Sequence, residues 1–281
     1  MNNHHTFLHE AEQKGYAIPA FNYSDIWELL GITEAAMEEH ARIYIASNMG
    51  VVDALGLEYC STMGQVAYRM SGGNILNHLD HSTSVDLCLA AVESGYMSVM
   101  IDGSAEPLEK NIEKVKSVVE FAHKKGVLVE AEIGRIKGAG EEGVFKSGQY
   151  LAEVDDAIEL IRETGVDSLA VGIGNAHGFY KEKPNINIQR LREIDQMVEV
   201  PLVLHGSTGI PFETIRQCIQ NGVAKVNVGT QLHGGYLDQL RTELEKQKNV
   251  FSIPNIFEPV KNEVKKIVKE WIAVCGADGR Y

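Results

Sequence analysis

The sequence alternates short apolar runs with longer amphipathic segments, and this alternation constrains the fold more than any other feature. Eight runs have the length and composition of β-strands, and they cover residues 17–21, 42–47, 75–79, 98–101, 127–132, 168–172, 201–204 and 225–228. The segments between them have helical periodicity, as in residues 25–39, 84–94, 106–125, 155–164, 188–197 and 211–221. Runs that are apolar at nearly every residue are typical of parallel strands covered on both faces. The sequence therefore predicts eight successive βα units.

Several predicted helices end in a glycine just before the next strand, at Gly95, Gly126, Gly165 and Gly222. Glycine readily takes the left-handed conformation that ends a helix, so these positions predict αβ loops. Eight βα units favour the α/β class and a single (β/α)8 barrel over residues 1–281. A doubly wound open sheet is the alternative, but the GxGxxG turn that such a sheet often carries after its first strand is absent. Residues 236–281 are mostly charged amphipathic helix, and we expect a C-terminal helical extension that closes or flanks the barrel.

Composition excludes several classes of protein. Of the 281 residues, 44% are hydrophobic and 23% are charged, which excludes disorder, collagen-like repeats and a disulfide scaffold. The net charge of −13 argues against nucleic acid as a partner, because phosphate backbones need a basic face. Small phosphorylated ligands, held by a few local donors, remain compatible with this charge. The four cysteines form no CxxC pair, and the chain has neither a signal-peptide pattern nor an apolar stretch long enough to span a membrane, so we expect a cytoplasmic protein.

Three histidines fall at the ends of predicted strands. In a (β/α)8 barrel the side chains that follow the strands meet at one end, so His81, His177 and His205 are expected to converge there. Three imidazoles suit a tetrahedral Zn²⁺ site with one position open for substrate. Asp102 and Glu132 also follow strands, and they would either form a second, carboxylate-rich metal position or orient the histidines. The alternative is that each of these residues is a structural hydrogen-bonding group in a loop.

Asp80 directly precedes one of the three histidines. Next to a metal it would transfer protons, and its alternative role is to cap the helix that begins near residues 82–84. His78 should point to the same side as Asp80 if the strand continues, and we expect it to pack inside the protein. The remaining histidines fall on predicted helices or loops and are interpreted as surface residues: His9, His40, His123 and His233.

Two Gly-containing loops, residues 205–209 and 227–230, follow the seventh and eighth strands. Barrel phosphate sites are often built from these two loops, although two tight turns would have the same composition. Lys181 adds a cation near the same end of the barrel. The Gly-rich segment 137–148 contains Glu141 and Glu142, and it is either a mobile lid carrying a carboxylate or a solvated surface loop.

Six segments carry a family resemblance, namely residues 15–22 (GYAIPAFN), 78–81 (HLDH), 98–104 (SVMIDGS), 130–134 (EAEIG), 174–178 (GNAHG) and 202–206 (LVLHG). They resemble the signature segments of class II fructose-bisphosphate and tagatose-bisphosphate aldolases, in the same order over nearly the whole chain. The resemblance implies a zinc-dependent (β/α)8 barrel that is a homodimer or homotetramer. It also implies reversible cleavage of a ketose phosphate to dihydroxyacetone phosphate and an aldehyde.

The resemblance assigns roles by position. His81, His177 and His205 match the zinc ligands, and Asp80 matches the acid/base for the cleaved hydroxyl. Asp102 and Glu132 resemble a second metal position found in some members. The dihydroxyacetone phosphate end, often with Na⁺ or K⁺ nearby, would be held by residues that include Ser47, Gly178, Lys181, Gly206, Ser207, Thr208, Asn227, Gly229 and Thr230. Glu141 or Glu142 would be the lid acid that exchanges the C3 proton.

The residues also favour a metal mechanism over a Schiff base. Cleavage of the C3–C4 bond leaves an enediolate, and Zn²⁺ would take up its charge as a Lewis acid. A Schiff base would need a desolvated lysine at the C-terminal end of a strand. Lys225 begins the eighth run, so we expect it at the opposite end of the barrel.

Four departures from the family pattern concern the substrate. The usual His-Gly-Gly-Ser-Gly is His205-Gly-Ser-Thr-Gly here, Gly229 stands where Asp or Ala is usual, and residues 22–25 replace an Asn-rich run. Residues 251–255 replace an Asp-Pro-Arg stretch that follows a phosphate-binding arginine, for which Arg241 is the nearest candidate. A ketose 1-phosphate or a deoxy-ketoaldonate phosphate is therefore an alternative substrate. A sugar-phosphate-binding protein without turnover is a third possibility.

Overall fold

The computed structural model describes residues 4–136, 151–180 and 182–281. Eight parallel strands form a closed barrel in sequence order, with the first strand paired to the last. The strands are β1 (Ile18–Asn22), β2 (Ile43–Asn48), β3 (Ile75–Ser82), β4 (Ser98–Ile101), β5 (Leu128–Ile133), β6 (Ser168–Val171), β7 (Leu202–Leu204) and β8 (Val223–Val228). Closure confirms the predicted (β/α)8 barrel and excludes the open sheet.

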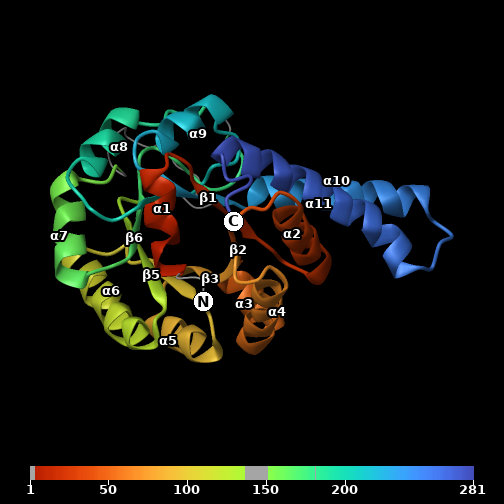
Figure 1. Ribbon diagram of the computed structural model, residues 1–281, viewed down its shortest axis with the longest axis horizontal. Helices are drawn as coiled ribbons and strands as arrows, with labels where there is room; N and C mark the ends of the chain where they lie inside the picture. Colours follow the sequence, from red (N-terminus) through yellow and green to blue (C-terminus); the bar gives the residue numbers. More distant parts are fainter. Residues whose placement is uncertain (1–3, 137–150, 181) are drawn as a thin grey trace.

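Figure 1 shows helices around the barrel and the first helix, residues 7–13, across one end of it. Those of the first half are α1 (Phe7–Gln13), α2 (Ile26–Glu38), α3 (Met49–Leu55), α4 (Leu57–Met70), α5 (Val85–Ser94) and α6 (Leu108–Ala122). Those of the second half are α7 (Val154–Thr164), α8 (Ile188–Asp195), α9 (Phe212–Ile219), α10 (Thr230–Lys246) and α11 (Ile253–Cys275). Several end where the glycine pattern predicts, since Gly95, Gly126 and Gly165 take left-handed conformations at helix ends.

The C-terminal extension consists of two helices that pack against each other, and their far ends project from the barrel (Figure 1). The extension begins at Thr230, six residues earlier than the sequence suggests, because α10 starts directly after β8. Helix α11 also packs on α2, where a Cβ on Gly31 would lie 2.8 Å from Val264. Glycine allows this close approach of the two helices.

The main apolar core lies between the strands and the surrounding helices, and all four cysteines are buried in it without forming a disulfide. Inside the barrel a smaller apolar cluster is made by Met100, Ile136, Ala170 and Val203. Buried polar side chains occupy much of the remaining interior, below the C-terminal ends of the strands. Among the described residues, no helix has the length and apolarity needed to cross a membrane.

Candidate metal centre and active site

Asp80 and His81 both face a pocket at the C-terminal end of the barrel, although they are neighbours on one strand. Side chains of adjacent strand residues normally point to opposite faces. Here the register between β3 and β4 shifts between Leu79 and Ser82, and His81 has a φ of 48°. A bulge of this kind redirects one side chain, and a left-handed non-glycine residue is the sort of backbone strain that gathers at functional sites. The irregularity thereby brings both groups into one pocket.

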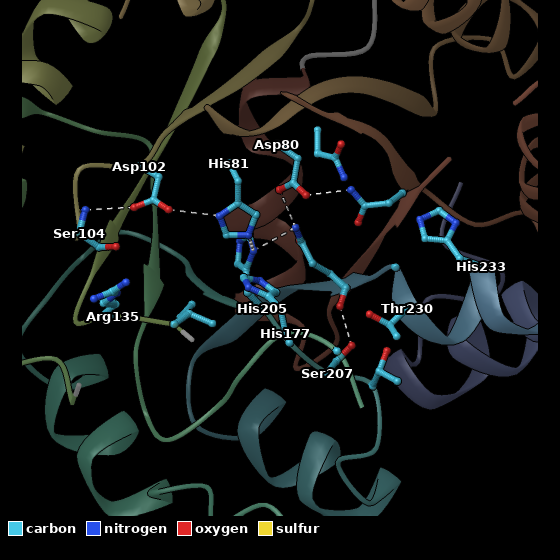
Figure 2. A pocket seen from close by; sticks show the side chains of 18 of the residues that line it. Asp80, His81, Asp102, Ser104, Arg135, His177, His205, Ser207, Thr230 and His233 are labelled. Carbon is cyan, nitrogen blue, oxygen red and sulfur yellow. Dashed lines mark hydrogen bonds and ion pairs between the residues drawn. The ribbon is translucent and has the colours of Figure 1, made fainter. Parts of the chain in front are cut away.

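The imidazoles of His81, His177 and His205 converge in this pocket, as Figure 2 shows. One ring nitrogen from each lies within 4.8 Å of the others. Nδ1 of His205 is 2.7 Å from Nε2 of His81. Nε2 of His177 is buried and has no hydrogen-bond partner among the described residues. Burial and the neighbouring imidazoles lower the pKa of His177 to about 3, so this ring is held neutral, the form that binds a metal.

Carboxylates engage the outer nitrogens of two of these rings. Nε2 of His205 is 2.8 Å from Oε1 of Glu130, and Nδ1 of His81 is 3.3 Å from Oδ2 of Asp102. If each ring donates its N–H to its carboxylate, the two nitrogens that face each other both present lone pairs. Lone pairs 2.7 Å apart require a proton or a cation between them. The donor set therefore fits a metal ion, and the carboxylates orient its ligands.

Glu132 lies beside the same histidine. Its Oε2 is 3.8 Å from Nδ1 of His81 and has no hydrogen-bond partner among the described residues, while its Oε1 accepts from Ser104. Burial and the nearby Asp102 carboxylate raise the pKa of Glu132 to about 8. His81, Asp102 and Glu132 form a second group whose donor atoms lie within 4.8 Å of one another. This group could hold a second cation or serve only to orient His81.

Two asparagines hold the Asp80 carboxylate in place. Asn22 on β1 donates to Oδ2 at 2.8 Å, and Asn227 on β8 donates to Oδ1 at 3.0 Å. Burial alone would raise the pKa of Asp80, but its electrostatic interactions with His81, His205 and the Lys225 ammonium outweigh burial and keep the pKa below its usual range. The carboxylate is therefore ionised, oriented and next to the imidazole cluster, which are the properties of a general base.

A buried ion pair lies beneath the cluster, inside the barrel. Nζ of Lys225 is 2.6 Å from Oε2 of Glu130, whose other oxygen bonds His205. Lys225 also approaches Nε2 of His78 at 3.3 Å, and burial with the lysine charge lowers the pKa of His78 to about 3. The expectation that Lys225 lies at the opposite end of the barrel is wrong, because β8 begins two residues earlier and places the lysine within the barrel. The expectation that His78 packs inside is confirmed.

The two Gly-containing loops line the pocket together. Gly206 has a φ of 62°, and a Cβ there would lie 2.3 Å from the carbonyl oxygen of Ala176. Ser207 donates to the carbonyl of Asn227 at 2.5 Å, and Thr208 accepts from the N–H of Gln231 in the first turn of α10. These contacts join the loops of β6, β7 and β8 at the N-terminus of a helix, a place that favours anions.

The pocket has a volume of about 450 Å³ and contains most of the residues selected from the sequence. The predicted site residues that line it are Asp80, His81, Asp102, His177, Gly178, His205, Gly206, Ser207, Thr208, Asn227, Gly229 and Thr230. Ser47 does not, because it is fully buried and its hydroxyl pairs with Tyr96 at 2.6 Å; Asn48 lines the pocket instead. Lys181, Glu141 and Glu142 lie outside the described residues.

Seven pocket residues were not selected as site residues from the sequence: Asn22, Asn48, Ser104, Ala105, Arg135, Ile136 and His233. Asn22 and Asn48 are the last residues of β1 and β2, so their positions after apolar runs could have indicated that they face the pocket. Arg135 follows β5 by two residues. The interpretation of His233 as a surface residue is wrong, because it lies one turn into α10, lines the pocket and bonds buried Glu28.

Fold and site together define a (β/α)8-barrel enzyme with a candidate metal centre at the C-terminal ends of its strands. Comparison with known proteins agrees with this class. The family model described as fructose-bisphosphate aldolase class-II matches residues 2–280. The chain therefore belongs to the class II fructose-bisphosphate aldolase family, whose members are carbon–carbon lyases.

Solved structures extend this comparison. The YdjI aldolase from Escherichia coli K12 is 31% identical, with a TM-score of 0.87 over 98% of this chain and 97% of that one. A putative fructose-1,6-bisphosphate aldolase from Coccidioides immitis is 28% identical, with a TM-score of 0.89 over 99% and 98% of the two chains. Fructose-bisphosphate aldolase from Campylobacter jejuni, at 19% identity, shares the fold with a TM-score of 0.84 over 98% and 94%.

Proposed function

We propose that this protein is a zinc-dependent aldolase that reversibly cleaves a ketose bisphosphate, of the fructose or tagatose 1,6-bisphosphate type. The products would be dihydroxyacetone phosphate and an aldehyde such as glyceraldehyde 3-phosphate. The observation that carries the proposal is the convergence of His81, His177 and His205 beside the oriented Asp80 carboxylate.

His81, His177 and His205 would hold the catalytic zinc. When bound, Zn²⁺ supplies the Lewis acidity that stabilises the enediolate charge. Asp102 and Glu130 would each keep one ring nitrogen protonated, so that the other faces the metal. A second divalent ion would take the group that contains Glu132, and a monovalent cation would lie near the Gly-containing loops.

Asp80 would accept the proton of the C4 hydroxyl as the C3–C4 bond breaks. Its two asparagine partners hold the carboxylate and leave its charge available, and general-base assistance of this kind contributes about 10²–10⁴-fold in rate. For the C3 proton of the enediolate we propose Glu141 or Glu142 as the acid, from the resemblance alone.

The phosphate at C1 would lie on the loops 205–209 and 227–230. Gly178, Gly206 and Gly229 let backbone N–H groups approach the oxygens, and Ser207, Thr208 and Thr230 add hydroxyls. Asn227 contributes through the position of its loop, and we also propose Lys181 as a cation for this phosphate.

Release of dihydroxyacetone phosphate from a panel of ketose mono- and bisphosphates tests the proposal, with and without a chelator. We expect release that the chelator abolishes and zinc restores. Release that continues unchanged after complete removal of metal would contradict it. Turnover at an ordinary enzymatic rate would also exclude the non-catalytic sugar-phosphate-binding alternative.

A ketose 1-phosphate or a deoxy-ketoaldonate phosphate is the second candidate substrate. The position of Arg241, the residue that the sequence suggested for the distal phosphate, favours this candidate. Its side chain is 70% exposed on α10, pairs with Asp238 and does not line the pocket, so it would not bind a distal phosphate there. Arg135 lines the pocket on the side away from Thr230, as Figure 2 shows, where the distal end of a substrate would lie. A strong preference in kcat/KM for bisphosphates, reduced in Arg135→Met and unchanged in Arg241→Met, would select the bisphosphate. Equal use of monophosphates would select the second candidate.

A homodimer or homotetramer is the assembly we propose. An apolar groove of about 240 Å³ lies between α2 and α4, and exposed Tyr59, Val66 and Met70 contribute to it. Exposed apolar surface of this kind often marks an interface. Light scattering of the purified chain tests the assembly, and a monomer at micromolar concentration would contradict it.

Cytoplasmic location is proposed from the four buried, unpaired cysteines. Such cysteines are usual in reducing compartments. Cell fractionation with an antibody to the native protein tests this proposal.

A further inference from the structure

His233 is an ionisable side chain that lines the pocket on the side where the proposed phosphate lies. It belongs to the first turns of α10, three residues after Thr230, and residues three apart on a helix share a face. Figure 2 shows His233 and Thr230 on one side of the pocket, with Asp102 and Arg135 on the other side. Arg135 is the only arginine or lysine among the described residues that line the pocket, so the phosphate side has no such side chain from the described part of the chain.

A buried carboxylate fixes the orientation of this imidazole. Nδ1 of His233 is 2.8 Å from Oε1 of Glu28, which is 2% exposed. The other oxygen of Glu28 accepts the backbone N–H of Ser24 at 2.7 Å, so the carboxylate is itself held at the start of α2. With Nδ1 donating to Glu28, Nε2 is the nitrogen that can serve a ligand, and it makes no hydrogen bond to the described residues.

The surroundings favour the charged form of this ring. Burial alone would lower the pKa of His233, but the hydrogen bond and the negative charge of Glu28, with the charge of Asp25, raise it above its usual value. Asp25 and Glu28 come from α2, and Tyr236 on α10 is a neutral neighbour that donates to Asp25. Within the described part of the chain, His233 forms no hydrogen bond with the histidines of the candidate metal centre, and the charges that raise its pKa are those of Glu28 and Asp25.

We propose that His233 is a phosphate-binding residue: its imidazolium, oriented by Glu28, donates from Nε2 to the phosphate monoester of the substrate and makes binding of that group pH-dependent. This inference rests on the proposed function, because it concerns the same pocket. A charge-assisted hydrogen bond at a partly buried site is typically worth tenfold or more in affinity. His233 thus adds to the two loops a positive charge that is lost as the pH rises.

The direction of the pH dependence follows from two ionisations. A phosphate monoester acquires its second negative charge near pH 6, and His233 loses its positive charge above its raised pKa. Affinity for the dianion is therefore expected to be highest between these two values and to fall as the pH rises through the pKa of His233. Glu28→Gln keeps an oxygen for the Ser24 N–H but removes the charge, so the fall should occur at lower pH.

Binding of glycerol 3-phosphate, measured by calorimetry from about pH 6 to 9, tests the proposal without any need for turnover. We expect His233→Gln to lose about tenfold in affinity near pH 6.5 and to have a flatter pH profile, with a higher KM and a nearly unchanged kcat if the protein is an aldolase. His123→Gln is the matched control, since His123 is also a histidine paired with a carboxylate, Asp167, but is exposed outside the pocket.

Three results would overturn the inference. They are no binding of glycerol 3-phosphate to the wild-type protein, wild-type affinity and pH profile in His233→Gln, or an equal loss in that variant at every pH. The last result would show a structural role for the side chain. Binding without cleavage of any ketose phosphate would contradict the proposed function instead, and the variant would still decide the role of His233.

Discussion

Hydrogen bonds to neighbouring side chains fix the orientation of the ionisable residues in and beneath this pocket. His81 and His205 each commit one ring nitrogen to a carboxylate and turn the other toward the cluster. Asp80 is fixed by two asparagines from strands at opposite ends of the sequence. A site built in this way is held in position before any ligand arrives, because its side chains have few other rotamers that keep these bonds.

Glu130 bonds His205 with one carboxylate oxygen and Lys225 with the other, and Glu130→Gln tests both interactions. We expect zinc affinity to fall about 10–100-fold, because the amide orients His205 less well than a carboxylate does. We also expect a loss of about 3–5 kcal/mol in the free energy of unfolding, because Lys225 is left buried without its counter-charge. Zinc competition with a chromophoric chelator and urea unfolding measure the two effects.

The double variant Glu130→Gln/Lys225→Met is the control for this prediction. Removing both charges should restore much of the stability and leave zinc affinity low, since the orienting carboxylate is still absent. Wild-type zinc affinity in the double variant would show that Glu130 does not position His205.

Asp80→Asn tests the proposed base. The amide keeps the size of the side chain but cannot take a proton, so kcat should fall about 10²–10⁴-fold while bound zinc stays the same. Zinc content by mass spectrometry and the rate of cleavage are the measurements, and Asp238→Asn, on the exposed face of α10, is the control. Activity within threefold of wild type would rule out Asp80 as the base.

At the scale of strands and loops, regular features could be predicted from the sequence and irregular ones could not. The eight apolar runs and the glycines after helices predict the βα units because both depend on local residue preferences. Strand alternation cannot predict that Asp80 and His81 face the same pocket, since this depends on a shift in register between β3 and β4. Likewise a two-residue difference in where β8 begins decides whether Lys225 lies at the end of the barrel or inside it.

Pocket residues on helices, and hydrogen bonds between strands that are far apart in the sequence, are the features that the sequence predicts least well. His233 has no sequence feature that separates it from an exposed helical histidine, because its place depends on how α10 meets β8 and α2. The hydrogen bond of Asn22 to Asp80 joins residues 58 positions apart, on two strands that lie on either side of β2. Contacts of this kind are properties of three-dimensional packing and leave no periodic pattern in one sequence.

Gly206→Ala tests how tightly the loops of β6 and β7 fit. The new Cβ would meet the carbonyl oxygen of Ala176, so the loops that carry His177 and His205 must move apart. We expect a loss of about 3 kcal/mol in the free energy of unfolding, from left-handed strain plus the clash, and weaker zinc binding.

Gly165→Ala is the matched control for that variant. Gly165 has a φ of 66°, close to that of Gly206, but a Cβ there would contact nothing within 4 Å. Only the backbone strain of about 1–2 kcal/mol should appear, with zinc binding unchanged. Equal losses of stability and zinc affinity in the two variants would contradict the close fit between the loops.

At the scale of the whole molecule, a metal held by His81, His177 and His205 would join β3 to the loops that follow β6 and β7. Because it binds the folded state only, zinc at about 1,000 times its Kd should add about 4 kcal/mol to the free energy of unfolding. Thermal unfolding with and without a chelator measures this difference, and His177→Ala should abolish it. A chelator effect of equal size in His177→Ala would place the stabilising metal elsewhere.

The pairing of the first strand with the last also bears on how the protein is made. Ile18 pairs with Lys225, and Asp80 takes its two hydrogen bonds from Asn22 and Asn227. During synthesis the early strands must wait for the final fifth of the chain, with their edges unpaired and open to association with other chains. A ribosome that stops before residue 223 would release a product that lacks not only a strand but also Asn227, one of the two asparagines that orient Asp80. The candidate active site is therefore complete only after β8 has been synthesised and has paired with β1.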